Sequence, residues 1–315
     1  MLFRSVIVLE NAYHGHTEAL IDMSPYKFNG PGGAGARDFV HVAPMPDDYR
    51  GRYRRDNPRC GLEYGREVGE MIARLVGLGR TPAAFIAETL PSVGGQIVPP
   101  PGYLAEVYRH VRRVGAVCIA DEVQVGFGRL GSHFWGFEMQ GVVPDIVVLG
   151  KPIGNGFPLA AVIATPEIAS SFNNGMEFFS TFGGNPVACA AGLAVLDVLR
   201  DENLQANARD VGGQLLEGLQ GLMAKHTLVG DVRGAGLFLG IELVRDRATR
   251  EPATTETAYV VNRLRELGVL TGADGPHENV IKLRPPLMLT RADADLFLKT
   301  LDEVLSEDGA KMGSE

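Results

Sequence analysis

Two apolar runs in this sequence end on side chains that can exchange protons. The run 117–120 leads into Asp121, and the run 146–150 leads into Lys151. In open parallel sheets a ligand binds beyond the carboxyl ends of the strands, so charged residues that close such runs are candidates for chemistry. A single carboxylate or lysine at a strand end is more often structural. Together, Asp121 and Lys151 would place an acid and an amine at the ends of neighbouring strands.

A carboxylate and an amine are what pyridoxal 5'-phosphate (PLP) needs from a protein. PLP is an electron sink only while its ring nitrogen is protonated, and a buried carboxylate paired with that nitrogen keeps the proton there. Asp121 is the candidate for this role. A lysine beside a cationic group has a lowered pKa, so it can hold PLP as a Schiff base and act as a base near neutral pH. Lys151 is the candidate for both tasks.

Two long motifs around these residues resemble the class III PLP-dependent aminotransferase family. They are the segment 120–129, with the sequence ADEVQVGFGR, and the segment 150–158, with the sequence GKPIGNGFP. The similarity extends from residue 5 to near residue 305. It implies an α/β protein of PLP-dependent transferase fold type I, which is the aspartate-aminotransferase fold. We therefore expect a large, mostly parallel sheet and a small C-terminal α+β domain.

The resemblance implies further cofactor contacts within one subunit. Tyr13 would stack on the PLP ring, and Val123 would lie on the opposite face. Gln124 would hydrogen-bond to the ring hydroxyl, and Glu88 would line the same pocket. Without the motif, Tyr13 would be interpreted as an ordinary core aromatic residue.

A contact between subunits is implied as well. Thr181 precedes the segment 182–186, which could be only a helix cap but also offers free backbone N–H groups suited to a phosphate. In the family pattern Thr181 reaches the cofactor phosphate of the neighbouring subunit. The resemblance therefore implies a homodimer with shared active sites.

The elements that must position these residues follow from the hydrophobic pattern. Up to about residue 200, short apolar runs alternate with amphipathic helical stretches, which is typical of a parallel sheet covered by helices. We predict a large PLP-binding domain, N-terminally incomplete, over 1–205 and a small C-terminal domain over 206–315. The predicted strands are 5–9, 84–88, 117–121, 146–149, 160–164, 236–244 and 280–283, and the predicted helices include 62–78, 102–114 and 187–200.

Composition and charge exclude several classes of protein. The chain has 315 residues, 45% of them apolar, and a net charge of -8 with both signs interspersed, which argues against a nucleic-acid partner. The apolar run 6–9 is too short for a signal-peptide core or a membrane span, so we expect a cytoplasmic protein with no membrane partner. His14 and His16 lack a metal-spaced cluster and are interpreted as loop residues or hydrogen-bonding partners. No metal is predicted.

One family feature does not occur in this chain. Relatives carry a turn of the type GSEAN before the segment that matches 5–9, and this turn cradles the cofactor phosphate at a helix start. We therefore expect that an N-terminal part is missing, either because the chain is a fragment or because its reading frame starts too late.

The substrate is indicated by Lys282. Family members that act on amino acids have an arginine at this position, which grips a carboxylate with two hydrogen bonds. Several also have a glutamate where Val93 stands. The segments 92–97 and 273–277 instead resemble the phospho-lyases of ethanolamine phosphate and 5-phosphohydroxy-L-lysine. Lys282 is thus a candidate substrate residue, and Arg284 could face the same pocket because residues two apart on a strand share a face.

Three functions follow from these observations. The first is elimination of phosphate from a phosphorylated amine, which gives an aldehyde, ammonia and phosphate. The second is an ω-aminotransferase, which differs in needing a keto acid. The third is an inactive truncated subunit that only assembles with a complete partner, and it ranks last because loss of a central sheet segment should more often cost solubility than create a regulator.

Overall fold

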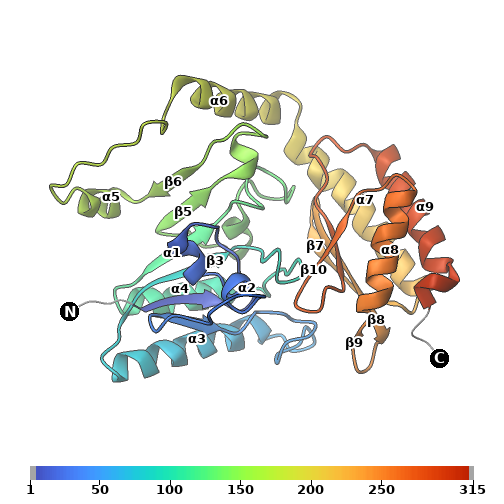
Figure 1. Cartoon of the computed structure of the whole chain (residues 1–315), viewed down its shortest axis with the longest axis horizontal. Coiled ribbons are helices and arrows are strands. Elements are labelled where there is room, and N and C mark those ends of the chain that lie inside the picture. Colours follow the sequence, from blue (N-terminus) through green and yellow to red (C-terminus); the bar gives the residue numbers. More distant parts are fainter. Residues whose placement is uncertain (1–4, 312–315) are drawn as a thin grey trace.

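The computed structural model describes residues 5–311, and over this range it contains two sheets with separate hydrophobic cores (Figure 1). The first sheet and its helices come from the first half of the chain. Their elements are β1 (Ser5–Leu9), α1 (Glu18–Asp22), α2 (Pro25–Phe28), β2 (Val40–Ala43), α3 (Cys60–Gly77), β3 (Pro82–Glu88), α4 (Tyr103–Arg113), β4 (Val117–Asp121), β5 (Ile146–Leu149), β6 (Ala161–Ala164) and α5 (Pro166–Phe172). Short 3-10 helices cover Gly136–Gln140 and Lys151–Ile153.

The first sheet has the strand order β2-β1-β3-β4-β5-β6. Its neighbouring strands are parallel except for β6, which runs antiparallel to β5. Parallel strands present their carboxyl ends at one edge, where a ligand can be held. This edge therefore carries the residues that follow β3, β4 and β5.

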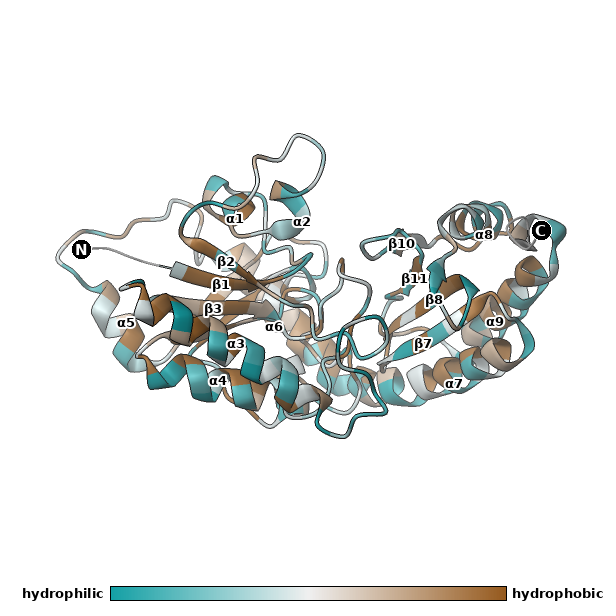
Figure 2. Ribbon diagram, turned by 90° about the horizontal axis from the view of Figure 1, so that it is seen from below, coloured by the Kyte–Doolittle hydropathy of each residue, from teal (hydrophilic) through white to brown (hydrophobic). Residues whose placement is uncertain are grey.

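Helices α3 and α4 cover one face of this sheet. Helix α3 buries Tyr64, Val68 and Ile72, which recur every four residues and so lie on one side of the helix. These side chains share a core with Ile7 of β1 and Phe85 of β3. Figure 2 shows the two helices side by side against the apolar strands, with their hydrophilic faces turned outward. This packing fixes the strands whose ends form the candidate site.

The second sheet belongs to the C-terminal part of the chain. Its neighbouring strands are antiparallel, in the order β10-β11-β8-β7, and β9 pairs with β8. Helices α7, α8 and α9 pack against it (Figure 1). The elements are α6 (Pro186–Asp201), α7 (Leu204–Lys225), β7 (Val229–Ala235), β8 (Phe238–Asp246), β9 (Glu251–Pro252), α8 (Thr254–Glu266), β10 (Gly272–Asp274), β11 (Val280–Leu283), α9 (Arg291–Ser306) and a 3-10 helix at Asp308–Lys311.

The predicted fold class, a large mostly parallel sheet followed by a smaller α+β part, is confirmed. The predicted strand 236–244 appears as β8, which starts two residues later, and β7 was not predicted. Strand β7 buries Asp231 and Arg233, so its sequence does not read as an apolar run. The domain boundary after residue 205 falls inside α7 and stays a prediction. No helix within residues 5–311 is both long and apolar enough to cross a membrane.

Candidate active site

Three strand ends bring the predicted polar residues together. Glu88 closes β3 and Asp121 closes β4, and their Cα atoms are partners in the parallel register. Strand β5 lies next to β4, with Asp121 opposite Val148, and Lys151 follows shortly after. The carboxyl edge of the sheet therefore brings the carboxylates of Glu88 and Asp121 close to the amine of Lys151, as the apolar runs predicted for Asp121 and Lys151.

Lys151 occupies an unusual backbone position. Its φ is 39°, in the left-handed region that side chains other than glycine rarely adopt, and such strain is concentrated at functional sites. The Nζ donates a hydrogen bond to Gln124 Oε1 at 3.1 Å. Burial of the amine lowers the pKa of Lys151, and the negative charges of Asp121 and Glu88 partly offset this effect. The amine is thus easier to deprotonate even without a cationic cofactor beside it.

Asp121 is a buried carboxylate with a fixed orientation. Its Oδ1 accepts the backbone N–H of Val123 at 3.1 Å, and its Oδ2 lies 2.8 Å from Nδ1 of His14. The His14 side chain is 1% exposed, and its Nε2 is buried with no hydrogen-bond partner within residues 5–311. Sequence reasoning did not place His14 beside Asp121, and its position directly after Tyr13 was the available signal.

Glu88 fixes two backbone segments near the same edge. Its Oε1 accepts the N–H of Tyr13 at 3.3 Å, and its Oε2 accepts the N–H of Ser92 at 3.0 Å. Burial, followed by the negative charge of Asp121, raises the pKa of Glu88 to about 7. Glu88 can therefore exist in either protonation state at neutral pH while it holds the loop that begins at Ser92.

Val123 and Gln124 lie beside Lys151. A Cβ added to Gly150 would stand 3.2 Å from Val123 Cγ1, so the Val123 side chain packs against the residue before Lys151. Gln124 links Lys151 to Ser92, because its Nε2 donates to Ser92 Oγ at 3.1 Å.

Tyr13 and Thr181 are the two remaining cofactor candidates. Tyr13 is tied to the strand ends by its N–H bond to Glu88, while its ring packs edge-on to Tyr26, with centroids 6.0 Å apart. Thr181 is exposed and belongs to the connection between α5 and α6. Figure 1 shows this connection extending away from the first sheet. The structure therefore brings together the cofactor residues predicted within one subunit, and their individual roles stay predictions. The role of Thr181, which was predicted to reach the cofactor of a neighbouring subunit, stays a prediction too.

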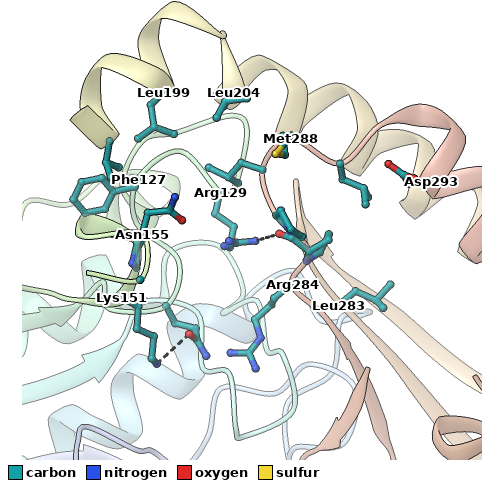
Figure 3. A pocket seen from close by; sticks show the side chains of 18 of the residues that line it. Phe127, Arg129, Lys151, Asn155, Leu199, Leu204, Leu283, Arg284, Met288 and Asp293 are labelled. Carbon is teal, nitrogen blue, oxygen red and sulfur yellow. Dashed lines mark hydrogen bonds between the residues drawn. The ribbon is translucent and has the colours of Figure 1, made fainter. Parts of the chain in front are cut away.

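A pocket of ≈ 1640 Å³ opens between the two sheets at Lys151. Gln124 and Lys151 line it from the first sheet, and Lys282 and Arg284 line it from the second (Figure 3). Lys282 Nζ lies 2.9 Å from Oδ1 of Asp274 on β10. Lys282 thus reaches the pocket, as the sequence predicted, but its charge is already paired. Within residues 5–311 no group of three or more His, Cys, Asp or Glu side chains could hold a metal ion.

Comparisons with known proteins identify the family of this chain. The family described as aminotransferase class-III matches residues 4–305. A Drosophila melanogaster protein named alanine--glyoxylate aminotransferase 2-like is 50% identical over 96% of this chain and 62% of its own length. A Caenorhabditis elegans protein named ethanolamine-phosphate phospho-lyase homolog 1 is 42% identical over 96% of this chain and 68% of its own length. The chain thus spans less than two thirds of its Drosophila relative.

Solved structures of this fold are also similar to this chain. A phospholyase from Arthrobacter in complex with phosphoethanolamine superimposes with a TM-score of 0.89 at 38% identity, over 96% of this chain and 71% of that one. A PLP-bound amine transaminase from an uncultivated Pseudomonas species has a TM-score of 0.87 at 36% identity, over 96% of this chain and 69% of that one. The solved neighbours thus include both a phospholyase and an amine transaminase.

The residues at the strand ends, Glu88, Asp121 and Lys151, fit PLP together with His14. Asp121 offers a buried carboxylate for the protonated ring nitrogen. Beside it, His14 Nε2 is buried without a hydrogen-bond partner among residues 5–311, so a polar group of a ligand could pair with it. Lys151 offers an amine that burial makes easier to deprotonate. PLP is therefore the cofactor that the geometry and the solved neighbours have in common.

Proposed function

Because this chain belongs to the class III aminotransferase family, we propose that the whole protein is a PLP-dependent phospho-lyase. Its substrate is a phosphorylated amine, ethanolamine phosphate or 5-phosphohydroxylysine, and its products are an aldehyde, ammonia and inorganic phosphate. The observation that carries this proposal is the charge of the pocket. Two cations, Lys282 and Arg284, stand near one carboxylate, Asp274, and relatives that act on amino acids resemble this segment but carry an arginine in place of Lys282.

An ω-aminotransferase is the second candidate. Its support is the name of the Drosophila relative, which is 50% identical to this chain. The residues that hold PLP would serve both reactions, so the difference lies in what happens to the substrate after its proton is removed.

The residues of this chain divide the work of elimination. PLP, when bound, supplies the electron sink that makes the proton beside the substrate nitrogen acidic. Lys151 takes that proton, and Gln124, which accepts a hydrogen bond from Lys151 Nζ, orients the amine. Asp121, which is held by His14, would keep the ring nitrogen of PLP protonated. The electron pair left by that proton forms a double bond to the adjacent carbon, and phosphate leaves with the electrons of its C–O bond. Water then hydrolyses the resulting enamine to aldehyde and ammonia.

We predict that the full-length protein releases phosphate from ethanolamine phosphate or phosphohydroxylysine without any added keto acid. Phosphate and ammonia are measured together, with and without pyruvate. Equal amounts of both products, unchanged by pyruvate, are expected because elimination consumes no amino acceptor. Amino transfer from alanine or ornithine, with no phosphate release, would overturn the lyase and support the aminotransferase.

We also propose that the protein is a homodimer with shared active sites. Large apolar side chains are exposed on α6 and on the connection before it, including Phe178, Phe182 and Leu193, which are 74%, 81% and 64% exposed. Exposed apolar surface of this extent is typical of a protein interface. Thr181 lies within this surface, so an interface there would carry Thr181 toward a second copy of the chain.

Shared sites predict rescue between two inactive subunits. A Lys151→Ala subunit mixed with a Thr181→Ala subunit forms heterodimers in which one of the two sites keeps both native residues. Random mixing should therefore restore about a quarter of wild-type activity.

A matched control is a mixture of Lys151→Ala with Asp121→Asn subunits, which should show no rescue because both residues belong to the same subunit's site. Absence of rescue in the Thr181 mixture, with dimers confirmed by light scattering, would contradict sharing.

A further inference from the structure

The cations around the pocket differ in how their charges are satisfied. Lys282 pairs with Asp274 at 2.9 Å. Arg129 donates hydrogen bonds from Nη1 to the carbonyls of Leu237 and Pro285, so it connects the two parts of the chain that carry the sheets. Burial, followed by the positive charge of Arg284, lowers the pKa of Arg129 to about 10. Arg129 and Lys282 therefore already have structural partners.

The positive charge of Arg284 is less well compensated than that of Lys282. Its Nη2 lies 4.0 Å from Oδ2 of Asp274, which is at the outer limit of an ion pair. Its Nη1 donates instead to the neutral hydroxyl of Ser92 at 3.1 Å. Figure 3 shows Arg284 and Lys151 extending toward the same space from opposite walls of the pocket. The guanidinium can therefore accept a further anion.

Ser92 fixes the position of Arg284 relative to Lys151. Its hydroxyl oxygen accepts hydrogen bonds from Gln124 Nε2 and Arg284 Nη1, both at 3.1 Å, and Gln124 in turn holds Lys151 Nζ. The Ser92 side chain is buried, and its N–H is held by Glu88. A continuous chain of hydrogen bonds thus sets the distance between the reacting amine and the guanidinium.

We propose that Arg284, positioned by Ser92, is the residue that recognises the phosphate group of the substrate, in place of the Lys282 that the sequence suggested. This assignment rests on the proposed phospho-lyase function. A substrate phosphate monoester carries a charge of about -1.5 to -2 at pH 7. It therefore suits the two cations around Asp274 better than a substrate carboxylate, which carries less negative charge. The planar guanidinium can also bind two phosphate oxygens at once, which an ammonium cannot do.

The position of Arg284 also suits the reaction. The phosphate leaves from the carbon next to the one that Lys151 deprotonates, so the two groups must be held on the two sides of one short substrate. Pro285 and Pro286 follow Arg284 directly and restrict the backbone at the end of β11. Arg284 therefore stands directly between the end of β11 at Leu283 and a stretch of restricted backbone.

The test measures the binding of inorganic phosphate to the PLP-loaded full-length protein by calorimetry. Arg284→Gln is expected to weaken binding by about tenfold to a hundredfold, the range for loss of a charged hydrogen-bonding pair. Arg284→Lys, which keeps the charge but loses the fork, should fall between wild type and Arg284→Gln. Lys282→Gln should weaken binding less than Arg284→Gln does. Arg66→Gln, an exposed arginine on α3, is the matched control for loss of one positive charge.

Steady-state kinetics separates recognition from chemistry. Arg284→Gln should raise KM for ethanolamine phosphate more than it lowers kcat. Ser92→Ala should raise KM as well, and KM should return toward the wild-type value in Ser92→Thr. Phosphate binding that is unchanged in both Arg284 variants, or weaker in Lys282→Gln than in Arg284→Gln, would overturn the assignment. Failure of the lyase function itself shows differently, as absence of phosphate release by the wild-type protein, and the phosphate-binding comparison still tests Arg284 in that case.

Discussion

Replacement of Lys151 by alanine is expected to abolish turnover, with kcat lowered by more than about 10⁴-fold. The loss is large because one amine serves both as the covalent partner of the cofactor and as the base that removes the substrate proton. At the carboxyl edge of the first sheet, Lys151 is the amine that donates a hydrogen bond to Gln124, and the charges of Asp121 and Glu88 influence its pKa. The measurement is steady-state phosphate and ammonia release by the purified variant.

Chemical labelling checks the same assignment without relying on activity. Borohydride reduction of the PLP-loaded wild-type protein should attach the cofactor to Lys151, as mapped by peptide mass spectrometry. Lys225→Ala is the matched control, because Lys225 is paired with Asp302 in the C-terminal part and should not affect labelling. A label on any other lysine would refute the assignment of Lys151.

The first sheet was largely predictable because its strands are short buried runs. Strands β1, β4 and β5 have the predicted bounds, since each run is apolar until a charged or turn residue ends it. Strand β2 was not predicted because it holds only Val40–Ala43 and includes a histidine. Strand β7 was not predicted because its buried Asp231 and Arg233 neutralise each other, and this pairing is visible only in three dimensions.

The candidate site was predictable only in part, for a similar reason. Asp121 and Lys151 followed from strand ends, because parallel strands must align their carboxyl ends. The contacts that decide the fine structure join residues far apart in the chain, such as Ser92 with Arg284 and His14 with Asp121. No local pattern encodes such a contact. The sequence therefore indicated Lys282 for the substrate, whereas the structure shows that Asp274 compensates its charge.

The charge of Asp121 influences the amine of Lys151 directly. Asp121 favours the protonated amine, and burial opposes it. Asparagine has the same shape but no charge, so Asp121→Asn should lower the pKa of Lys151. The fraction of deprotonated amine then rises at a given pH. In the cofactor-free protein, the pH profile of reductive methylation at Lys151, followed by mass spectrometry, should therefore move to lower pH.

Asp121→Asn is nevertheless expected to lower kcat of the PLP-loaded protein, by about a hundredfold or more, because an amide cannot hold the proton on the ring nitrogen. Greater reactivity of the amine and loss of turnover are thus expected in the same variant, a combination that simple unfolding would not produce. Asp121→Glu keeps the charge and should leave the methylation profile closer to that of wild type. Asp197→Asn, an exposed carboxylate on α6, is the matched control. If Asp121→Asn kept wild-type turnover, Asp121 would not be the partner of the ring nitrogen, and Glu88, another buried carboxylate at this edge, would become the candidate.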